Sequence, residues 1–353
     1  MKYRKKVLAQ MPKCYALAMF KGADVPSFVA GVEKEGPIRR FALNGDPLET
    51  VAEGPGGVMT LTQVPGRNDQ LLATCEFYSP NFGGDSARIV SYTRSEAGWK
   101  CSTVCDLPYV HRFGIVQAQD GRSWLLACTI KSSCRQVKED WSKPGAVYAA
   151  SLDESLENYN ETHQLALHTL AGTQLQNHGF WISPHKDFAL IATAAGVFRY
   201  IPPAYEGADW DITCLIVHPT SDIVMADFDG DGKAEILTFS AFHGEELAIW
   251  HEGAVEDSYE CVWKNPQPLK FLHALWAGEL GGVTCAVIGH RKAERDLLRV
   301  WFEDDRYHLE CIDHDFGPAN CWAYSTDQAE YVIAANRETD ELALYEVIPD
   351  EMA

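Results

Sequence analysis

The residues best suited to chemistry begin with an acidic stretch at 227–235, which reads DFDGDGKAE. Carboxylates at alternate positions can converge on one hard cation, and the two glycines let the backbone fold tightly around it. We therefore expect a Ca²⁺ site whose oxygen ligands come from Asp227, Asp229, Asp231, Lys233 (through its carbonyl) and Glu235.

The residues around this stretch indicate what kind of loop it is. An EF-hand opens with the same spacing, but it needs a bidentate Glu at its twelfth position, where this chain has Thr238. The flanking segments 221–226 and 236–240 are rich in β-branched and other apolar residues, so we expect the loop to join strands. In these respects 222–250 resembles the calcium loop of FG-GAP/VCBS β-propeller repeats, and the next two units resemble it in degraded form.

A second group of candidate residues consists of histidines. His111, His178 and His273 each stand at the start of an apolar, strand-like segment. A single histidine there is usually structural, but three at one repeat position among 12 histidines favour a function. Neutral imidazoles close to one another suit Zn²⁺, Mn²⁺ or Fe²⁺. Such a metal can polarise a carbonyl and acidify the adjacent C–H bond, as in β-elimination, dehydration or isomerisation of a sugar.

The turns that follow the second strand-like segment of each unit contribute a second set of polar residues. We expect His290 and Tyr78 to transfer protons beside the three histidines. The expected substrate-binding residues are Glu76, Lys131, His243, Arg291 and Arg337. In a metal-free alternative, a histidine is the base and Arg291 or Lys131 stabilises the developing enolate.

These residues are positioned by internal repeats with a period of roughly 45 residues, which is typical of propeller blades. The sequence predicts an all-β fold, a seven-bladed β-propeller in one domain. The orphan segment 6–11 is expected to pair with the last unit, which otherwise has only three strands, and so to close the ring. The expected blades are approximately 14–54, 55–108, 109–175, 176–219, 220–269, 270–317, and 318–353 together with 1–13.

The repeats place the start of each first strand at the channel mouth. His111, His178 and His273 should therefore face one another, with Asp222 and Asn320 at similar positions in two other blades. This arrangement is similar to that of the aldos-2-ulose dehydratase group and of propeller lyases such as oligogalacturonate lyase. The resemblance implies a histidine-bound metal near the channel, and His273 with the His290-Arg291 pair looks like the lyase arrangement.

Composition restricts the classes of partner. The formal net charge of −20 argues against nucleic acid and anionic membrane surfaces, because both would repel the protein. No apolar run is long enough for a transmembrane helix, and the basic N-terminus lacks the apolar stretch of a signal peptide. The 11 cysteines are scattered without a CxxC pair, so we expect mostly buried free thiols and a cytoplasmic location.

The hypothesis that best combines these features is an intracellular carbohydrate-active enzyme. It would be a metal-assisted lyase, dehydratase or isomerase that acts on a small sugar or uronate at the channel mouth. The alternative is a non-catalytic propeller that binds a protein or glycan through its top face. An enzyme should bind a transition metal in addition to Ca²⁺, whereas a binding module need not.

Overall fold

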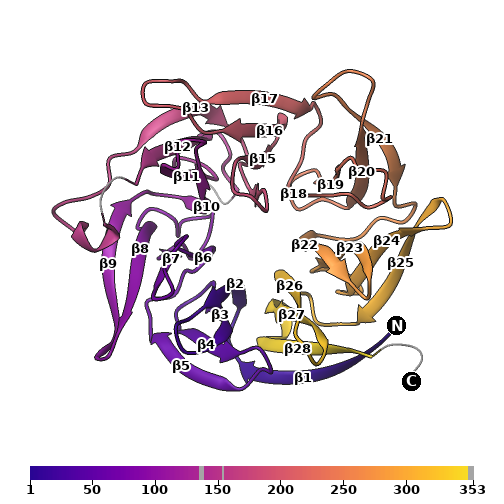
Figure 1. Ribbon diagram of the computed structural model, residues 1–353, viewed down its shortest axis with the longest axis horizontal. Helices are drawn as coiled ribbons and strands as arrows, with labels where there is room; N and C mark the ends of the chain where they lie inside the picture. Colours follow the sequence, from indigo (N-terminus) through magenta and orange to yellow (C-terminus); the bar gives the residue numbers. More distant parts are fainter. Residues whose placement is uncertain (135–138, 153–154, 349–353) are drawn as a thin grey trace.

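The chain forms seven four-stranded antiparallel sheets arranged in a ring (Figure 1). This seven-bladed β-propeller confirms the fold class expected from the repeats. The computed structural model describes residues 1–134, 139–152 and 155–348. The end of the last expected unit and two short stretches of the third therefore lie outside the described residues.

The strand bounds follow the chain sheet by sheet. The first three sheets are β2 (Cys14–Lys21), β3 (Pro26–Val32), β4 (Ile38–Ala42) and β5 (Pro47–Ala52); β6 (Leu61–Gln63), β7 (Gln70–Cys75), β8 (Arg88–Ser95) and β9 (Gly98–Asp106); and β10 (Val110–Gln117), β11 (Ser123–Thr129), β12 (Gly145–Ser151) and β13 (His168–Gln174). The next two are β14 (Gly179–Ile182), β15 (Ala189–Thr193), β16 (Gly196–Ile201) and β17 (Asp211–Ile216); and β18 (Asp222–Ala226), β19 (Glu235–Ser240), β20 (Glu246–Glu252) and β21 (Tyr259–Lys264).

The last two sheets complete the ring. They contain β22 (Leu272–Leu280), β23 (Val283–His290), β24 (Leu297–Glu303) and β25 (Arg306–Asp313); and β26 (Asn320–Ser325), β27 (Glu330–Asn336), β28 (Glu341–Ile348) and β1 (Lys2–Gln10). Two short 3-10 helices, η1 (Leu156–Asn158) and η2 (Arg337–Thr339), lie in connections. No helix within the described residues is long and apolar enough to span a membrane.

The N-terminal strand closes the ring. β1 pairs antiparallel with β28, from Lys2 opposite Ile348 to Gln10 opposite Glu341. In Figure 1 it runs along the outside of the last blade, beside β28. The closing strand expected at 6–11 is thus confirmed, but it spans Lys2–Gln10 and so begins four residues earlier. Its pairing covers an edge of the last sheet that would otherwise be free.

Apolar side chains on the facing surfaces of adjacent sheets form the core. Between the fifth and sixth blades, for example, Leu237, Ile249, Leu272, Ile288 and Val300 are all fully buried in one cluster. The innermost strand of each blade therefore holds a fixed position next to the centre of the ring (Figure 1). Seven of the eleven cysteines are buried, in agreement with the expectation of mostly buried thiols.

Candidate metal centre on the channel axis

Three histidines bring their donor nitrogens together at the centre of the ring. One ring nitrogen from each of His178, His243 and His273 lies within 4.8 Å of the others. The Nε2 atoms of His178 and His243 are 3.4 Å apart. The ring centroid of His273 is 5.3 Å from that of each of the other two. This spacing is short enough for three imidazoles to share one ion after small side-chain adjustments.

Backbone carbonyls of the neighbouring blades orient two of these rings. His178 Nδ1 lies 3.0 Å from the Ser221 carbonyl, and His273 Nδ1 lies 2.7 Å from the Ala319 carbonyl. A carbonyl only accepts, so each Nδ1 carries the proton and donates it, and each Nε2 carries a lone pair. Metal-binding histidines characteristically donate their second nitrogen in this way, which fixes both tautomer and ring orientation.

His243 reaches the cluster from the turn between β19 and β20. Its φ of 48° is unusual for a residue with a side chain. The conformation is held by packing, because the His243 ring lies between Phe242, with centroids 3.9 Å apart, and Phe271, with centroids 4.4 Å apart. Its backbone amide also donates to Ser221 Oγ at 3.2 Å. Constrained residues of this kind are frequent at functional sites.

A β-bulge recurs at the start of three inner strands. The pairing register passes from Cys14 to Ala16 in β2, and skips His111 in β10 and His273 in β22 in the same way. A bulge redirects the side chain of its extra residue. Tyr15, His111 and His273 are the three redirected residues, and the Tyr15 ring contacts the rings of both histidines.

Tyr15 connects two histidines of the cluster. Its hydroxyl is 3.1 Å from His273 Nε2 and 3.4 Å from His111 Nε2. Because His273 Nε2 carries a lone pair, the Tyr15 hydroxyl donates to it and can accept from His111. The structure therefore packs His111 against His178, with ring centroids 4.6 Å apart, and links it to His273 through Tyr15, while His243 completes the group of three donors. From the sequence, we expect His111 as a metal ligand and His243 as a substrate-binding residue.

Burial controls the charge of the cluster. Desolvation is the main cause that lowers the pKa of His178, to about 3, and it also lowers the pKa of His111, His243 and His273 well below the usual value. Nearby positive charge, including that of Arg112, acts in the same direction. The rings are therefore neutral near pH 7, which is the form that binds metal ions.

An acidic group lies beside the histidines. Burial raises the pKa of Asp222 to about 7, and Asp222 Oδ2 is 4.0 Å from His178 Nδ1. The guanidinium of Arg112 lies over the Tyr15 ring, 5.5 Å from its centroid, and donates to the Met59 carbonyl. The site thus contains one carboxyl group that changes protonation near neutral pH, together with a fixed cation.

The expected rim residues are held by local partners instead. Arg291 donates through Nε and NH2 to Glu338, Arg337 donates to Glu33 and Glu338, and Glu76 pairs with Arg88.

The other three expected residues bond to backbone groups. Lys131 is buried and donates to the Asp140 carbonyl. Tyr78 lies 3.4 Å from the Pro55 carbonyl. His290 Nδ1 donates to the Lys292 carbonyl, and its Nε2 accepts from the Asp296 amide, so it organises the turn after β23.

The acidic stretch 227–235 forms the loop between β18 and β19, as expected. β18 begins at Asp222 beside His178 and ends at Ala226. Five strand residues extend about 16 Å, so the loop and the histidines lie at opposite ends of the strand. Asp227 uses both carboxylate oxygens to accept amide protons, from Gly230 at 2.7 Å and Gly232 at 3.1 Å. Lys233 Nζ lies 4.0 Å from Glu252.

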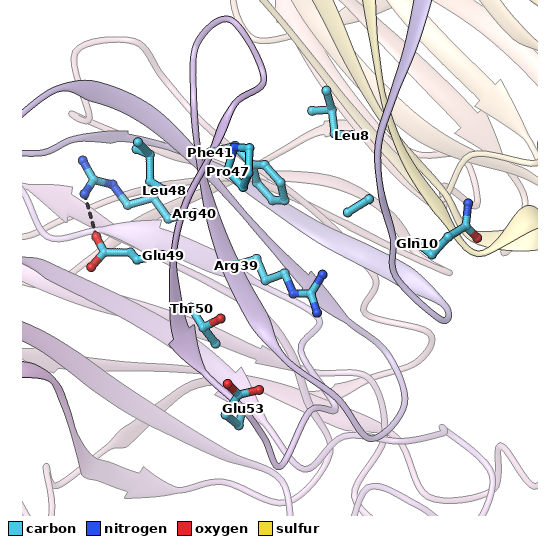
Figure 2. Close-up of a pocket in the computed structure, with 11 residues that line it drawn as sticks. Leu8, Gln10, Arg39, Arg40, Phe41, Pro47, Leu48, Glu49, Thr50 and Glu53 are labelled. Carbon is cyan, nitrogen blue, oxygen red and sulfur yellow. Dashed lines mark hydrogen bonds and ion pairs between the residues drawn. The ribbon is translucent and has the colours of Figure 1, made fainter.

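Two pockets lie away from the histidines. One, of about 550 Å³, is on the side of the molecule between β1 and the outer strands of the first blade (Figure 2). Its lining includes Arg39, Arg40 and Glu49, and Arg40 donates to Glu49 at 2.7 Å. The second, of about 200 Å³, is lined by residues such as Val64 and Leu156. Neither pocket is lined by a residue of the histidine cluster.

Similarity to known proteins is confined to the fold. No family model and no curated protein matches the chain. The Cps50 (Swd1) beta-propeller domain of Myceliophteria thermophila superposes with a TM-score of 0.63 at 8% identity, covering 98% of this chain and 100% of that one. A streptogramin B lyase structure superposes with a TM-score of 0.58 at 11% identity, covering 98% of both chains. The propeller is thus similar in shape both to that domain and to an enzyme named as a lyase.

Proposed function

We propose that the protein is a metal-assisted lyase, dehydratase or isomerase that acts on a small sugar or uronate in the cytoplasm. Its metal, Zn²⁺, Mn²⁺ or Fe²⁺, would be held on the channel axis by His178, His243 and His273. The observation that carries this proposal is the convergence of three neutral imidazoles, two of which are oriented by backbone carbonyls.

The donor set fits a transition metal. Imidazole nitrogens are ligands for Zn²⁺, Mn²⁺ and Fe²⁺, whereas Ca²⁺ selects oxygen. His178 and His273 each carry a lone pair on Nε2. These lone pairs now accept from His243 Nε2 and from the Tyr15 hydroxyl, respectively, so a bound metal would replace both hydrogen bonds. His243 Nε2 donates towards His178 Nε2 in the present arrangement, so binding requires its proton to leave or to move to Nδ1. Three protein ligands leave coordination positions open for a substrate.

The surrounding residues suit proton transfer. When bound, the metal would supply Lewis-acid polarisation of a substrate carbonyl or carboxylate. Tyr15 connects His111 to His273 through its hydroxyl, so it can carry a proton between the cluster and His111. Asp222, with a pKa of about 7, can exchange a proton near neutral pH. Arg112 contributes fixed positive charge that favours an anionic substrate.

Access to the cluster is most direct from His243. His111, His178 and His273 are at most 4% exposed, whereas His243 is only half-buried. Phe242 and Phe271 flank it and would form the walls of the approach. The carbohydrate class itself is supported by the resemblance of the channel histidines to those of propeller lyases and dehydratases.

A second candidate function is non-catalytic binding of a protein or glycan. It is favoured by the rim arginines, because Arg291 and Arg337 are neutralised by Glu338 and Glu33 and are not free to grip a substrate anion. In that case an axial ion would have a purely structural role.

Metal analysis and activity separate the two functions. Chelator-treated protein is reloaded with Zn²⁺ or Mn²⁺, and bound metal is measured for the wild type, His243→Gln and the exposed control His185→Gln. We expect His243→Gln to bind one ion fewer per chain and the control to match the wild type. Turnover of oligouronates, followed by the ultraviolet absorbance of the unsaturated product, should be lost with the ion. Equal metal content in all three proteins would contradict the centre, and metal binding without any turnover would favour the second candidate.

A further inference from the structure

The acidic loop contains a ligand that its sequence motif does not include. Donor atoms of Asp229, Asp231, Glu235 and His251 all lie within 4.8 Å of one another. The first three come from the loop and its junction with β19, whereas His251 comes from β20 of the same blade. The group therefore joins three carboxylates of the loop region to one imidazole on the strand that pairs with β19.

Each carboxylate of this group is oriented by a backbone amide. Asp229 Oδ1 accepts from the Asp231 amide at 3.1 Å, and Asp231 Oδ1 accepts from the Lys233 amide at 2.8 Å. Glu235 Oε2 accepts from the Phe228 amide at 2.7 Å. One oxygen of each carboxylate is thus anchored, which leaves the other to act as a single ligand.

Glu235 supplies the observation that points to a ligand. Its side chain is completely buried, and its Oε1 accepts no hydrogen bond within the described part of the chain. A buried carboxylate oxygen without a hydrogen bond is strongly unfavourable unless a cation compensates for it. Among the described residues, His251 is the basic side chain within ion-pair distance of this oxygen, with its Nε2 3.7 Å away.

His251 is prepared to act as a ligand. Its Nδ1 donates to the Glu252 carbonyl at 2.8 Å, and its Nε2 donates to Asp231 Oδ2 at 3.0 Å and points towards Glu235, so a bound metal ion would take the place of the Nε2 proton. This is the same arrangement of a carbonyl behind the imidazole that orients His178 and His273. By contrast, both oxygens of Asp227 accept loop amides, so Asp227 shapes the loop.

We propose that Asp229, Asp231, Glu235 and His251 form a site for a divalent first-row transition metal such as Zn²⁺ or Mn²⁺, in preference to Ca²⁺. Ca²⁺ requires six to eight oxygen ligands, and an imidazole in the coordination shell selects against it. Zn²⁺ readily combines carboxylate oxygen with histidine nitrogen in four-coordinate sites. The site is independent of the channel centre.

The test measures metal affinity by isothermal titration calorimetry on full-length, metal-free, reduced protein. The background carries His243→Gln, which weakens the channel centre, and Cys311→Ser, which removes the thiol from an exposed group of Asp296, Cys311 and His314. In this background we expect one site that binds Zn²⁺ and Mn²⁺ at least tenfold more tightly than Ca²⁺. Adding His251→Gln should weaken Zn²⁺ binding by tenfold or more.

The matched control is His218→Gln. His218 also pairs with a carboxylate, Glu246, at 3.0 Å, and has a similar partial exposure, but it lies outside the group. It should leave the Zn²⁺ affinity unchanged. Thermal melts without metal verify that each variant is folded, and Glu235→Gln, which keeps the side-chain shape, provides a second test. Tighter binding of Ca²⁺ than of Zn²⁺ and Mn²⁺, or equal Zn²⁺ affinity with and without His251, would overturn the proposal.

Discussion

At the residue scale, burial dominates the chemistry of the channel. Desolvation depresses the pKa of four imidazoles and raises that of Asp222, so all five groups favour their neutral forms. The two kinds of group act on stability with opposite sign. The histidine contribution is present above the unfolded pKa of about 6.5 and is lost as pH falls. The Asp222 contribution is present below pH 4 and is lost as pH rises through about 7.

The histidine contribution leads to a pH-dependent prediction. Below pH 6.5 the unfolded chain takes up protons that the buried rings refuse until far lower pH, for His178 until about pH 3. His178→Gln should therefore lose about 1.4 kcal/mol less free energy of unfolding than the wild type between pH 7.5 and pH 5.5. Urea unfolding at the two pH values measures this. The exposed His185→Gln should behave as the wild type, and identical pH dependence of all three proteins would contradict the prediction.

At the element scale, β1 acts as a clamp on the ring. Its side chains reach the blades on either side of the last one. Tyr3 donates to Glu310 at 2.8 Å and Lys5 Nζ lies 3.3 Å from Asp313, both in β25, and Lys6 Nζ lies 3.4 Å from Asp46 of the first blade. The bulges of β2, β10 and β22 work on the opposite side of the sheets, at the axis. β1 thus closes the periphery of the ring, while the bulges of β2, β10 and β22 shape the site at its axis.

The clamp can be removed and restored. Deleting residues 2–10 should expose the edge of β28, lower the melting temperature and promote association, as detected by size-exclusion chromatography. A synthetic peptide of residues 2–10 should restore both properties by adding the missing strand, and a scrambled peptide should not. A truncated chain that melts like the wild type would show that β1 contributes little to closure.

At the scale of the whole molecule, two candidate metal sites lie at opposite ends of β18. The channel centre is next to Asp222, and the acidic loop follows Ala226. Both sites are built on strands of a rigid ring, with turn residues completing each one. In a protein of net charge −20, cations in these places would also reduce the repulsion among carboxylates.

Their separation predicts independent effects on stability. A metal at one hundred times its dissociation constant stabilises the folded state by about 2.7 kcal/mol per site. His243→Gln and His251→Gln should each remove one such increment of Zn²⁺-induced stabilisation, and the double variant should remove the sum, because distant sites add. Melting curves with and without Zn²⁺ measure this. A double variant that loses no more than either single variant would show that only one site binds.

The sequence alone determined the architecture. A repeat of about 45 residues and an unpaired N-terminal segment led to the seven blades and to their closure by β1, because propeller sheets must pair their edges. It also located the channel histidines and the acidic loop, since both follow from the repeat positions of residues with evident chemistry.

Only the tertiary structure decided which side chains converge. Bulges redirect the side chains of Tyr15 and His111, and no residue pattern in the sequence marks these bulges. Tyr15 does align with His111 and His273 in the repeats, and this alignment could have identified Tyr15 as a site residue. His243 reaches the channel cluster because it lies in a turn with a positive φ. His251 reaches the acidic loop because it lies on the neighbouring strand β20. Arg291 and Arg337 form ion pairs with carboxylates of other segments, Glu338 and Glu33. A repeat position specifies the strand and its end, whereas the direction of a side chain depends on register, turn conformation and the nearest opposite charge.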